Sequence, residues 1–370
     1  MTLYRAPGRV NLIGEHTDYN DGFVMPIAID RWTTASIESR AGRTLAVRSE
    51  AYSEWVELDL DAPEFSSWGP TGHWSDYVRG VAAVLQRQGV RIGGAEMVVT
   101  STVPAGAGLS SSAALEMAVG YALLDTAGVE IDRTALALAC QQAEHEFAGT
   151  RCGLMDQYIV AHGSAGQALL LDTRTLRPTW LPLPAEVAVV VCNTMTKHAL
   201  ASAGYNDRRA DCEAGVAILA ARLPRVRALR DVTPADLEAH RADLSDQVYR
   251  RCRHVVSENA RVEAAGRALQ QGDLGAFGDL MLASHRSLRD DYEVSTTELD
   301  VMVEIANGVE GVYGSRMTGG GFGGCTVNLV RADSVAAFCG EVSIRYARAT
   351  GRTPDVYPCV PSEGVHRWNG

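Results

Sequence analysis

The segment GRVNLIGEHTDYN, residues 8–20, places a cluster of charged and titratable side chains beside a short apolar run near the start of the chain. The cluster comprises Arg9, Glu15, His16 and Asp18. Their carboxylate, imidazole and guanidinium groups can accept and donate hydrogen bonds. A strand edge needs no such cluster, so the segment is either a solvated surface or the polar lining of a site.

The loop PAGAGLSSS at residues 104–112 has the chemistry of an anion site. Gly106 and Gly108 let the backbone turn and approach a ligand closely, and three serine hydroxyls follow where a helix begins. Free amides and the positive end of the helix dipole would then face an anion, and phosphate is the expected ligand. The loop matches neither the P-loop nor the GxGxxG pattern. The alternative interpretation is a plain serine N-cap after a glycine turn.

Carboxylates in two helical segments are candidates for catalysis and metal binding. Asp156 falls in the first turn of a short apolar helix in CGLMDQYIVAHG, where it could act as a general base or only complement the helix dipole. Glu144 and Glu146 lie at opposite edges of an apolar stripe in AEHEFAG. Either could join a serine hydroxyl in binding a divalent metal, or be a solvated helix flank, and their spacing does not choose between them.

The stretch TGGGFGG at 318–324 is too rich in glycine for the interior of a strand. It predicts a loop whose backbone approaches another chain segment or a phosphate, or else a structural tight turn. The charge-rich run YNDRR, which begins at Tyr205, is by default a solvated helix face.

Composition narrows the class of protein. A chain of 370 residues is long enough for two domains, and a formal net charge of −11 argues against a broad basic surface for nucleic acid. No leader or run long enough to span a bilayer is visible, so a soluble cytoplasmic protein is expected. The eight cysteines are widely spaced without a CxxC pair, which predicts reduced structural thiols.

The segments that must position these residues alternate between strand and helix periodicity. Residues 95–103 read as a strand that enters the Gly-rich loop, and 111–128 as a helix closed by Gly128. Further strands are expected at 33–39, 43–49, 167–173 and 187–194, with helices at 73–85 and from Asp132. After residue 200 the pattern is mostly helical. We expect two closely packed domains, 1–195 and 196–370, with a ligand cleft between them.

Taken in order, GRVNLIGEHTDYN, VPAGAGLSSSAALE, CGLMDQ and MTGGGFGGC resemble the galactokinase family of the GHMP sugar kinases over nearly the whole chain. The resemblance implies an α+β fold, with an N-terminal domain like ribosomal protein S5 domain 2 and a ferredoxin-like C-terminal domain. One departure is visible, because only Met1 to Arg5 precede the APGR run, where family members usually have a longer lead-in.

The resemblance also implies roles for individual residues. Asp156 would be the base and Arg9 would stabilise charge on the transferred phosphoryl group, while Ser112 and Glu144 would hold Mg²⁺, which favours Glu144 over Glu146. The implied sugar-binding residues are Glu15, His16, Thr17, Asp18, Gly153 and Tyr205. The implied ATP-phosphate residues are Gly106, Ala107, Gly108, Leu109, Ser110, Ser111 and Ser112. Trp74 and Tyr77 are candidates for an adenine slot, although core packing is the stronger interpretation for both.

The expected reaction is therefore phosphorylation of galactose at O1 by ATP. Two alternatives stay open: a kinase for a related sugar such as N-acetylgalactosamine, and a non-catalytic sensor of galactose and ATP. The expected partners are these small molecules, without nucleic acid or membrane, in a monomer or weak oligomer.

Overall fold

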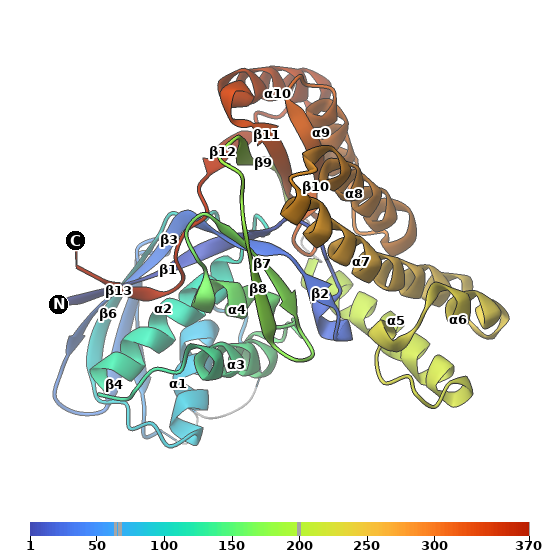
Figure 1. The fold of residues 1–370 in the computed structure, drawn as a ribbon. Helices are drawn as coiled ribbons and strands as arrows, with labels where there is room; N and C mark the ends of the chain where they lie inside the picture. The colour runs from blue at the N-terminus through green and yellow to red at the C-terminus, as the bar shows by residue number, and fades with distance from the viewer. Residues whose placement is uncertain (63–64, 66–68, 198–200, 370) are drawn as a thin grey trace.

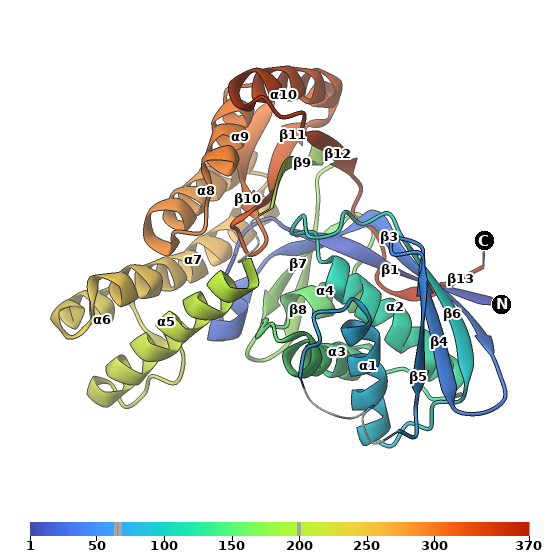
Figure 2. The same cartoon turned by 180° about the vertical axis from the view of Figure 1, so that it is seen from behind.

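The computed structural model describes residues 1–62, 65, 69–197 and 201–369. Its first part is built on a six-stranded sheet, antiparallel except for the β4–β6 pair. In spatial order the strands are β13 (His366–Trp368), β1 (Thr2–Asn11), β3 (Pro26–Ser39), β6 (Ala95–Ser101), β4 (Thr44–Ser49) and β5 (Glu54–Asp59). The last strand pairs with the first, so the two ends of the chain lie side by side (Figures 1 and 2).

Four helices accompany this sheet: α1 (Ser75–Arg87), α2 (Ser111–Thr126), α3 (Arg133–Ala143) and α4 (Met155–His162). Helix α2 packs on β1 and β3, and α1 and α3 pack against α2 (Figure 1). Because α2 is covered on both sides, buried side chains lie all round it, mostly apolar ones such as Ala113, Met117 and Leu123. The helix ends before Gly128, whose φ of 68° confirms the predicted stop.

The second part contains a four-stranded antiparallel sheet in the order β10 (Val312–Thr318), β11 (Gly323–Arg331), β9 (Val187–Lys197) and β12 (Asp355–Cys359). Counted along the chain, these strands lie in the order 2-3-1-4, with helices between the first and second and between the third and fourth. That is the ferredoxin-like arrangement expected from the sequence. The helices here are α8 (Leu274–Ser287), α9 (Thr297–Asn307) and α10 (Val335–Thr350).

Three more helices, α5 (Ala201–Arg222), α6 (Pro234–Ala239) and α7 (Asp246–Gln271), extend to one side of the molecule (Figures 1 and 2). A small sheet of β2 (Phe23–Val24), β7 (Gln167–Asp172) and β8 (Arg177–Pro182) lies beside α7. The remaining single turns are η1 (Asp18–Asn20), η3 (Glu144–Ala148), η4 (Leu229–Asp231), η5 (Arg241–Asp243), η6 (Leu288–Tyr292) and η7 (Ala332–Ser334).

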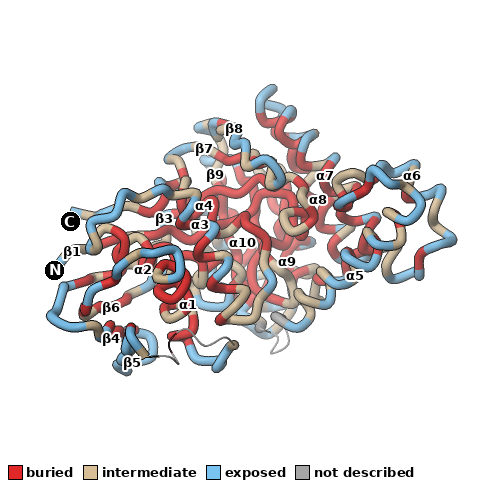
Figure 3. The backbone as a smooth tube through the Cα atoms, turned by 90° about the horizontal axis from the view of Figure 1, so that it is seen from below, coloured by how far each residue is buried: buried red, intermediate tan, exposed pale blue. Residues whose placement is uncertain are grey.

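The two parts share one apolar core, which runs from the six-stranded sheet to Val262, Phe277 and Cys325 in the second part. Buried backbone gathers where the parts meet, whereas β5 and α6 lie largely at the surface (Figure 3). The predicted domain boundary after residue 195 lies inside β9, and the division of the chain there stays a prediction. All eight cysteines are free thiols. Within the described ranges, no helix is long and apolar enough to cross a membrane.

Candidate active site

A cavity of about 680 Å³ opens where the two parts meet. It brings together β1, the turn after it, the loop before α2, the loop before α4, and the glycine-rich loop between β10 and β11. The sequence-predicted site residues that line it are Arg9, Glu15, His16, Asp18, Gly106, Gly108, Ser110, Ser111, Ser112, Glu144, Gly153, Asp156 and Tyr205.

Arg9 and Asp156 both line this cavity and pair with each other. Arg9 is buried in β1, and its Nε and Nη2 donate to the two carboxylate oxygens of Asp156 at 2.8 and 2.7 Å. Its third nitrogen donates to the carbonyl of Gly108 at 2.6 Å, and the Ser110 hydroxyl also donates to Asp156. This fork-shaped pair fixes both side chains, because two parallel hydrogen bonds restrict orientation as well as distance. It ties the first turn of α4 to the loop that precedes α2.

Asp18 lies on one side of this pair, where its carboxylate accepts from the backbone amides of Tyr19 at 3.0 Å and Met155 at 3.3 Å. Burial raises the pKa of Asp18 to about 6, and the negative charge of Asp156 adds to the shift. Gly153 makes this placement possible. A Cβ atom at that position would lie 1.9 Å from Asp18 Oδ2.

His16 adopts a left-handed backbone conformation, with a φ of 63°, and its ring is almost fully buried. Burial lowers the pKa of His16 to about 3, helped by the nearby His254, so the ring is neutral. Because a carbonyl can only accept, Nε2 donates to Gly320 O at 3.2 Å, and Nδ1 accepts from the hydroxyl of Tyr19 at 2.7 Å. The ring of Tyr205, from α5, lies 5.3 Å away and closes this side of the cavity.

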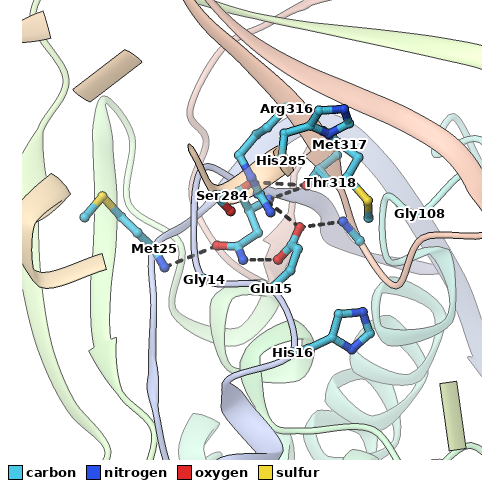
Figure 4. Close-up of polar contacts among 12 residues, drawn as sticks. Gly14, Glu15, His16, Met25, Gly108, Ser284, His285, Arg316, Met317 and Thr318 are labelled. Carbon is cyan, nitrogen blue, oxygen red and sulfur yellow. Dashed lines mark hydrogen bonds and ion pairs between the residues drawn. The ribbon is translucent and has the colours of Figure 1, made fainter. Parts of the chain in front are cut away.

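Glu15 lines the cavity, but its carboxylate is bonded to other groups of the same chain (Figure 4). Its Oε1 accepts from the amide of Gly319 at 2.6 Å and lies 3.3 Å from Nη1 of Arg316. Its Oε2 accepts from the side-chain amide of Asn11. The carboxylate therefore joins the turn after β1 to the glycine-rich loop.

Thr17 differs from its neighbours in the same turn. Its hydroxyl lies 2.9 Å from the carbonyl oxygen of Gly14 and 2.6 Å from that of Phe23, and the residue is fully buried outside the cavity lining. This side chain stabilises the turn, so its geometry does not support the predicted contact with a sugar. Sequence likeness assigned the whole EHTD run to the ligand, because it could not show that Thr17 turns into the core while Glu15, His16 and Asp18 line the cavity.

The loop from Gly106 to Ser112 connects β6 to α2 and presents its backbone to the cavity. Gly106, Gly108 and Ser110 have φ values of 66°, 78° and 58°, which produce the tight turn before the helix. The side chains of Ala107 and Leu109 point into the core, each only 1% exposed, so they anchor the loop and do not line the cavity. Three serines at the N-terminus of α2 do line it, and the positive end of a helix favours anions.

Glu144 meets the cavity from the single turn η3, where Ser112 and the Nε2 amide of Gln157, at 2.8 Å, donate to its carboxylate. Burial raises the pKa of Glu144 to about 7, and the charge of Asp156 adds to the effect. Glu146 instead pairs with Arg87 outside the cavity lining. The structure therefore separates two residues that sequence spacing left equivalent, and it brings a buried carboxylate and a hydroxyl together as hard oxygen donors.

The glycine-rich loop approaches other chain segments closely. A Cβ atom on Gly319 would lie 2.9 Å from the carbonyl oxygen of Gly108, and one on Gly324 would lie 2.8 Å from that of Ala107. Gly319 and Gly320 also line the cavity. Of the interpretations left open for TGGGFGG, close contact with another chain segment is therefore confirmed.

Sequence reasoning missed the polar side chains that support the site from inside the protein. On α7, His254 lies 3.1 Å from Glu15 O, and the carboxylate of Glu258 accepts from Gly14 N at 3.0 Å. Arg316 on β10 lies 3.3 Å from the carboxylate of Glu15, and Gln157 on α4 donates to the carboxylate of Glu144 at 2.8 Å. The available signal was the polar pair His254 and Glu258, spaced i, i+4 among the apolar residues of α7. From sequence alone such a pair cannot be distinguished from polar residues on a solvated side of the helix.

Comparisons with known proteins agree with this geometry. Three family models match: the "Galactokinase galactose-binding signature" over residues 2–39, the "GHMP kinases N terminal domain" over 76–164, and the "GHMP kinases C terminal" over 267–347. The α+β, two-domain GHMP kinase fold expected from the sequence is confirmed.

Full-length relatives extend the match. The chain is 47% identical over 365 residues to a galactokinase of Roseiflexus sp. (strain RS-1), covering 99% of this chain and 92% of that protein. It is 48% identical to a galactokinase of Chloroflexus aurantiacus, with 98% and 92% coverage.

Solved structures agree at the level of the fold. The crystal structure of Lactococcus lactis galactokinase complexed with galactose superposes with a TM-score of 0.95 at 35% identity, covering 99% of this chain and 95% of that one. A mevalonate kinase from Methanococcus jannaschii shares the fold alone, with a TM-score of 0.69 at 16% identity and 98% coverage of both chains. This chain belongs to the galactokinase family of the GHMP kinases.

Proposed function

We propose that this protein transfers the γ-phosphoryl group of ATP to O1 of α-D-galactose, giving galactose 1-phosphate and ADP. The observation that carries the proposal is the Arg9–Asp156 pair, which lies between the turn with Asp18 and the loop with Ser110 in one cavity. Phosphoryl transfer depends mainly on in-line positioning and on neutralising charge, and these groups can supply both.

In the proposed mechanism, Asp156 accepts the proton of the galactose O1 hydroxyl as that oxygen attacks the γ-phosphorus, and ADP leaves. Arg9, held against Asp156, offsets the charge that develops on the transferred group. Asp18, His16 and Tyr205 orient the sugar. Glu15 could add a further hydrogen bond to the sugar through its carboxylate, while it keeps Gly319 in place.

ATP would enter along the loop of residues 106–112, with its phosphates against the N-terminus of α2. Ser112 and Glu144 fit a magnesium ion, since a buried carboxylate beside a hydroxyl is a hard oxygen donor set. When bound, Mg²⁺ supplies charge neutralisation at the phosphates. Trp74 and Tyr77 also line the cavity, and their rings suit an adenine base.

Eight free thiols and the use of ATP support a cytoplasmic location. We propose a monomer or weak oligomer, in which the residues of a single chain form the site.

The test is turnover by the purified protein with Mg-ATP and a panel of galactose, N-acetylgalactosamine, glucose and arabinose, with ADP release followed over time. Galactose should be phosphorylated with the highest kcat/KM, and phosphorus NMR should assign the new phosphate to O1. Higher kcat/KM with N-acetylgalactosamine would make it a kinase for that sugar. Galactose binding in a calorimeter without turnover of any sugar would contradict the proposed enzyme and identify a sensor.

A further inference from the structure

Arg316 is a fully buried arginine on β10, beneath the turn that carries Glu15 and His16. Its Nη1 donates to the carbonyl of Asn11 at 3.1 Å and lies 3.3 Å from Glu15 Oε1 (Figure 4). Over the described ranges, Glu15 is the only carboxylate in ion-pair contact with it, and its Nε and Nη2 have no hydrogen-bond partner. Arg316 does not line the cavity.

A buried cation with so few partners is not explained by stability. An isolated charge in the protein interior is costly, and buried ion pairs are often no more stabilising than apolar residues of the same volume. The role of the Arg316 charge must therefore lie in the side chains that this arginine orients. Its neighbour Glu15 is 1% exposed, and that carboxylate holds the amide of Gly319 at 2.6 Å.

A second carboxylate lies under the same turn. Glu258 on α7 accepts from Gly14 N at 3.0 Å. Although burial alone would raise its pKa, the charges of Arg261, His254 and Arg316 lower the pKa of Glu258 to about 2. Glu15 is the carboxylate that Arg316 contacts directly, and Glu258 holds the neighbouring backbone amide of Gly14.

Glu15 connects this buried charge to the sugar end of the cavity. Gly319 and Gly320 line the cavity, and the carbonyl of Gly320 accepts from His16 Nε2 at 3.2 Å. No such contact leads from Arg316 to Ser112 or Glu144 in the part of the chain that the structure describes. A change in the orientation of Glu15 would therefore act first on the sugar-facing groups and leave Ser112 and Glu144 in place, even though Gly319 also packs against Gly108 of the phosphate loop.

We propose that Arg316 is a positioning residue for sugar recognition, which acts through Glu15 on the turn after β1 and on the glycine-rich loop. The inference rests on the proposed phosphorylation of galactose. It predicts an effect on galactose that is separable from any effect on ATP or on folding.

The experiment compares Arg316→Met with Arg251→Met as a matched control. Arg251 on α7 is also buried and paired with Glu293 at 2.5 Å, and its Nε has no hydrogen bond although it lies 3.6 Å from Asp211 Oδ2; the residue lies outside the cavity lining. Melting temperature, kcat, the KM values for galactose and ATP, and the galactose Kd by calorimetry are measured for both variants. Arg316→Lys tests rescue by a residue that restores the charge without the planar fork.

We expect Arg316→Met to raise the KM and Kd for galactose about tenfold or more, with the KM for ATP within twofold of the wild-type value. Arg316→Lys should recover part of the loss, and Arg251→Met should change galactose binding less than twofold. If Arg316→Met does not fold, Arg316→Gln removes the same charge while it keeps a donor toward the carbonyl of Asn11, and the same expectation applies.

Unchanged galactose binding in the charge-removing variant would overturn the inference. Equal rises in both KM values, or an equal loss in Arg251→Met, would overturn it as well, because they would show a purely structural effect. Wild-type protein that does not phosphorylate galactose would instead contradict the proposed function itself, so the two failures are distinguishable.

Discussion

Replacing Gly153 by alanine tests how closely the sugar side of the cavity is packed. A Cβ atom at Gly153 would lie 1.9 Å from Oδ2, 2.0 Å from Cγ and 2.5 Å from Oδ1 of Asp18, whereas ordinary contact begins at 3.4 Å. The carboxylate or the loop must therefore move by at least 3.0 − 1.9 = 1.1 Å to relieve the overlap, and by 3.4 − 1.9 = 1.5 Å to reach ordinary contact. The φ of Gly153 is not positive, so the expected effect comes from this overlap and not from backbone strain.

The displacement removes the contacts that hold Asp18. Its hydrogen bonds from Tyr19 N at 3.0 Å and Met155 N at 3.3 Å cannot both survive a shift of that size. Hydrogen bonds to charged groups contribute about 1.5 to 3 kcal/mol each, so the free energy of unfolding should fall by about 2 kcal/mol or more. A 1 Å misplacement of a positioning group can cost about 10²-fold in rate, and we expect kcat/KM for galactose to fall by that order.

The assay is ADP release as a function of galactose and of ATP concentration, with thermal unfolding measured in parallel. Gly340→Ala is the matched control, because a Cβ atom there meets open space on the exposed face of α10. That variant should keep wild-type kinetics and gain about 0.5 to 1 kcal/mol of stability, as alanine does over glycine in a helix. A Gly153→Ala protein whose kcat/KM for galactose stays within threefold of wild type would refute the packing argument.

Three further predictions concern the carboxylates of the cavity. Asp156→Asn should lower kcat by on the order of 10² or more while the galactose Kd changes only a few-fold, and near-normal turnover would exclude Asp156 as the base. Because the pKa of Asp18 is raised to about 6, kcat/KM for galactose should fall as the pH drops through 6, and Asp18→Asn should bind galactose weakly without that pH dependence. Stability should change with pH in the opposite direction, because the folded protein binds the proton of Asp18 more tightly than the unfolded chain does. The free energy of unfolding of the wild type, relative to that of Asp18→Asn, should therefore rise as the pH is lowered from 6 to 4, which urea unfolding can measure. Glu144→Gln should raise the Mg²⁺ concentration for half-maximal turnover about tenfold or more, whereas Glu146→Gln, whose carboxylate pairs with Arg87, should not; equal effects would contradict the assignment.

The segments of the fold could be predicted from local patterns. Apolar spacing and the start and stop signals of helices identified β6, α2 and α3 to within a few residues, because both follow directly from strand and helix geometry. Glycine and serine at 106–112 likewise predicted a turn followed by a helix N-terminus. The order of the strands could not be predicted in the same way, since it depends on contacts between segments far apart in the chain.

The sequence by itself determined which chemical groups are present and, through family likeness, which segments converge. Only the tertiary structure decided how each group is used. Glu144 faces the cavity and Glu146 does not, Thr17 supports a turn, and Glu15 is held by a buried arginine about which local spacing said nothing. The physical reason is that hydrogen-bond partners and desolvation depend on neighbours supplied by distant segments, whereas local spacing fixes only which side of its own helix or strand a residue occupies.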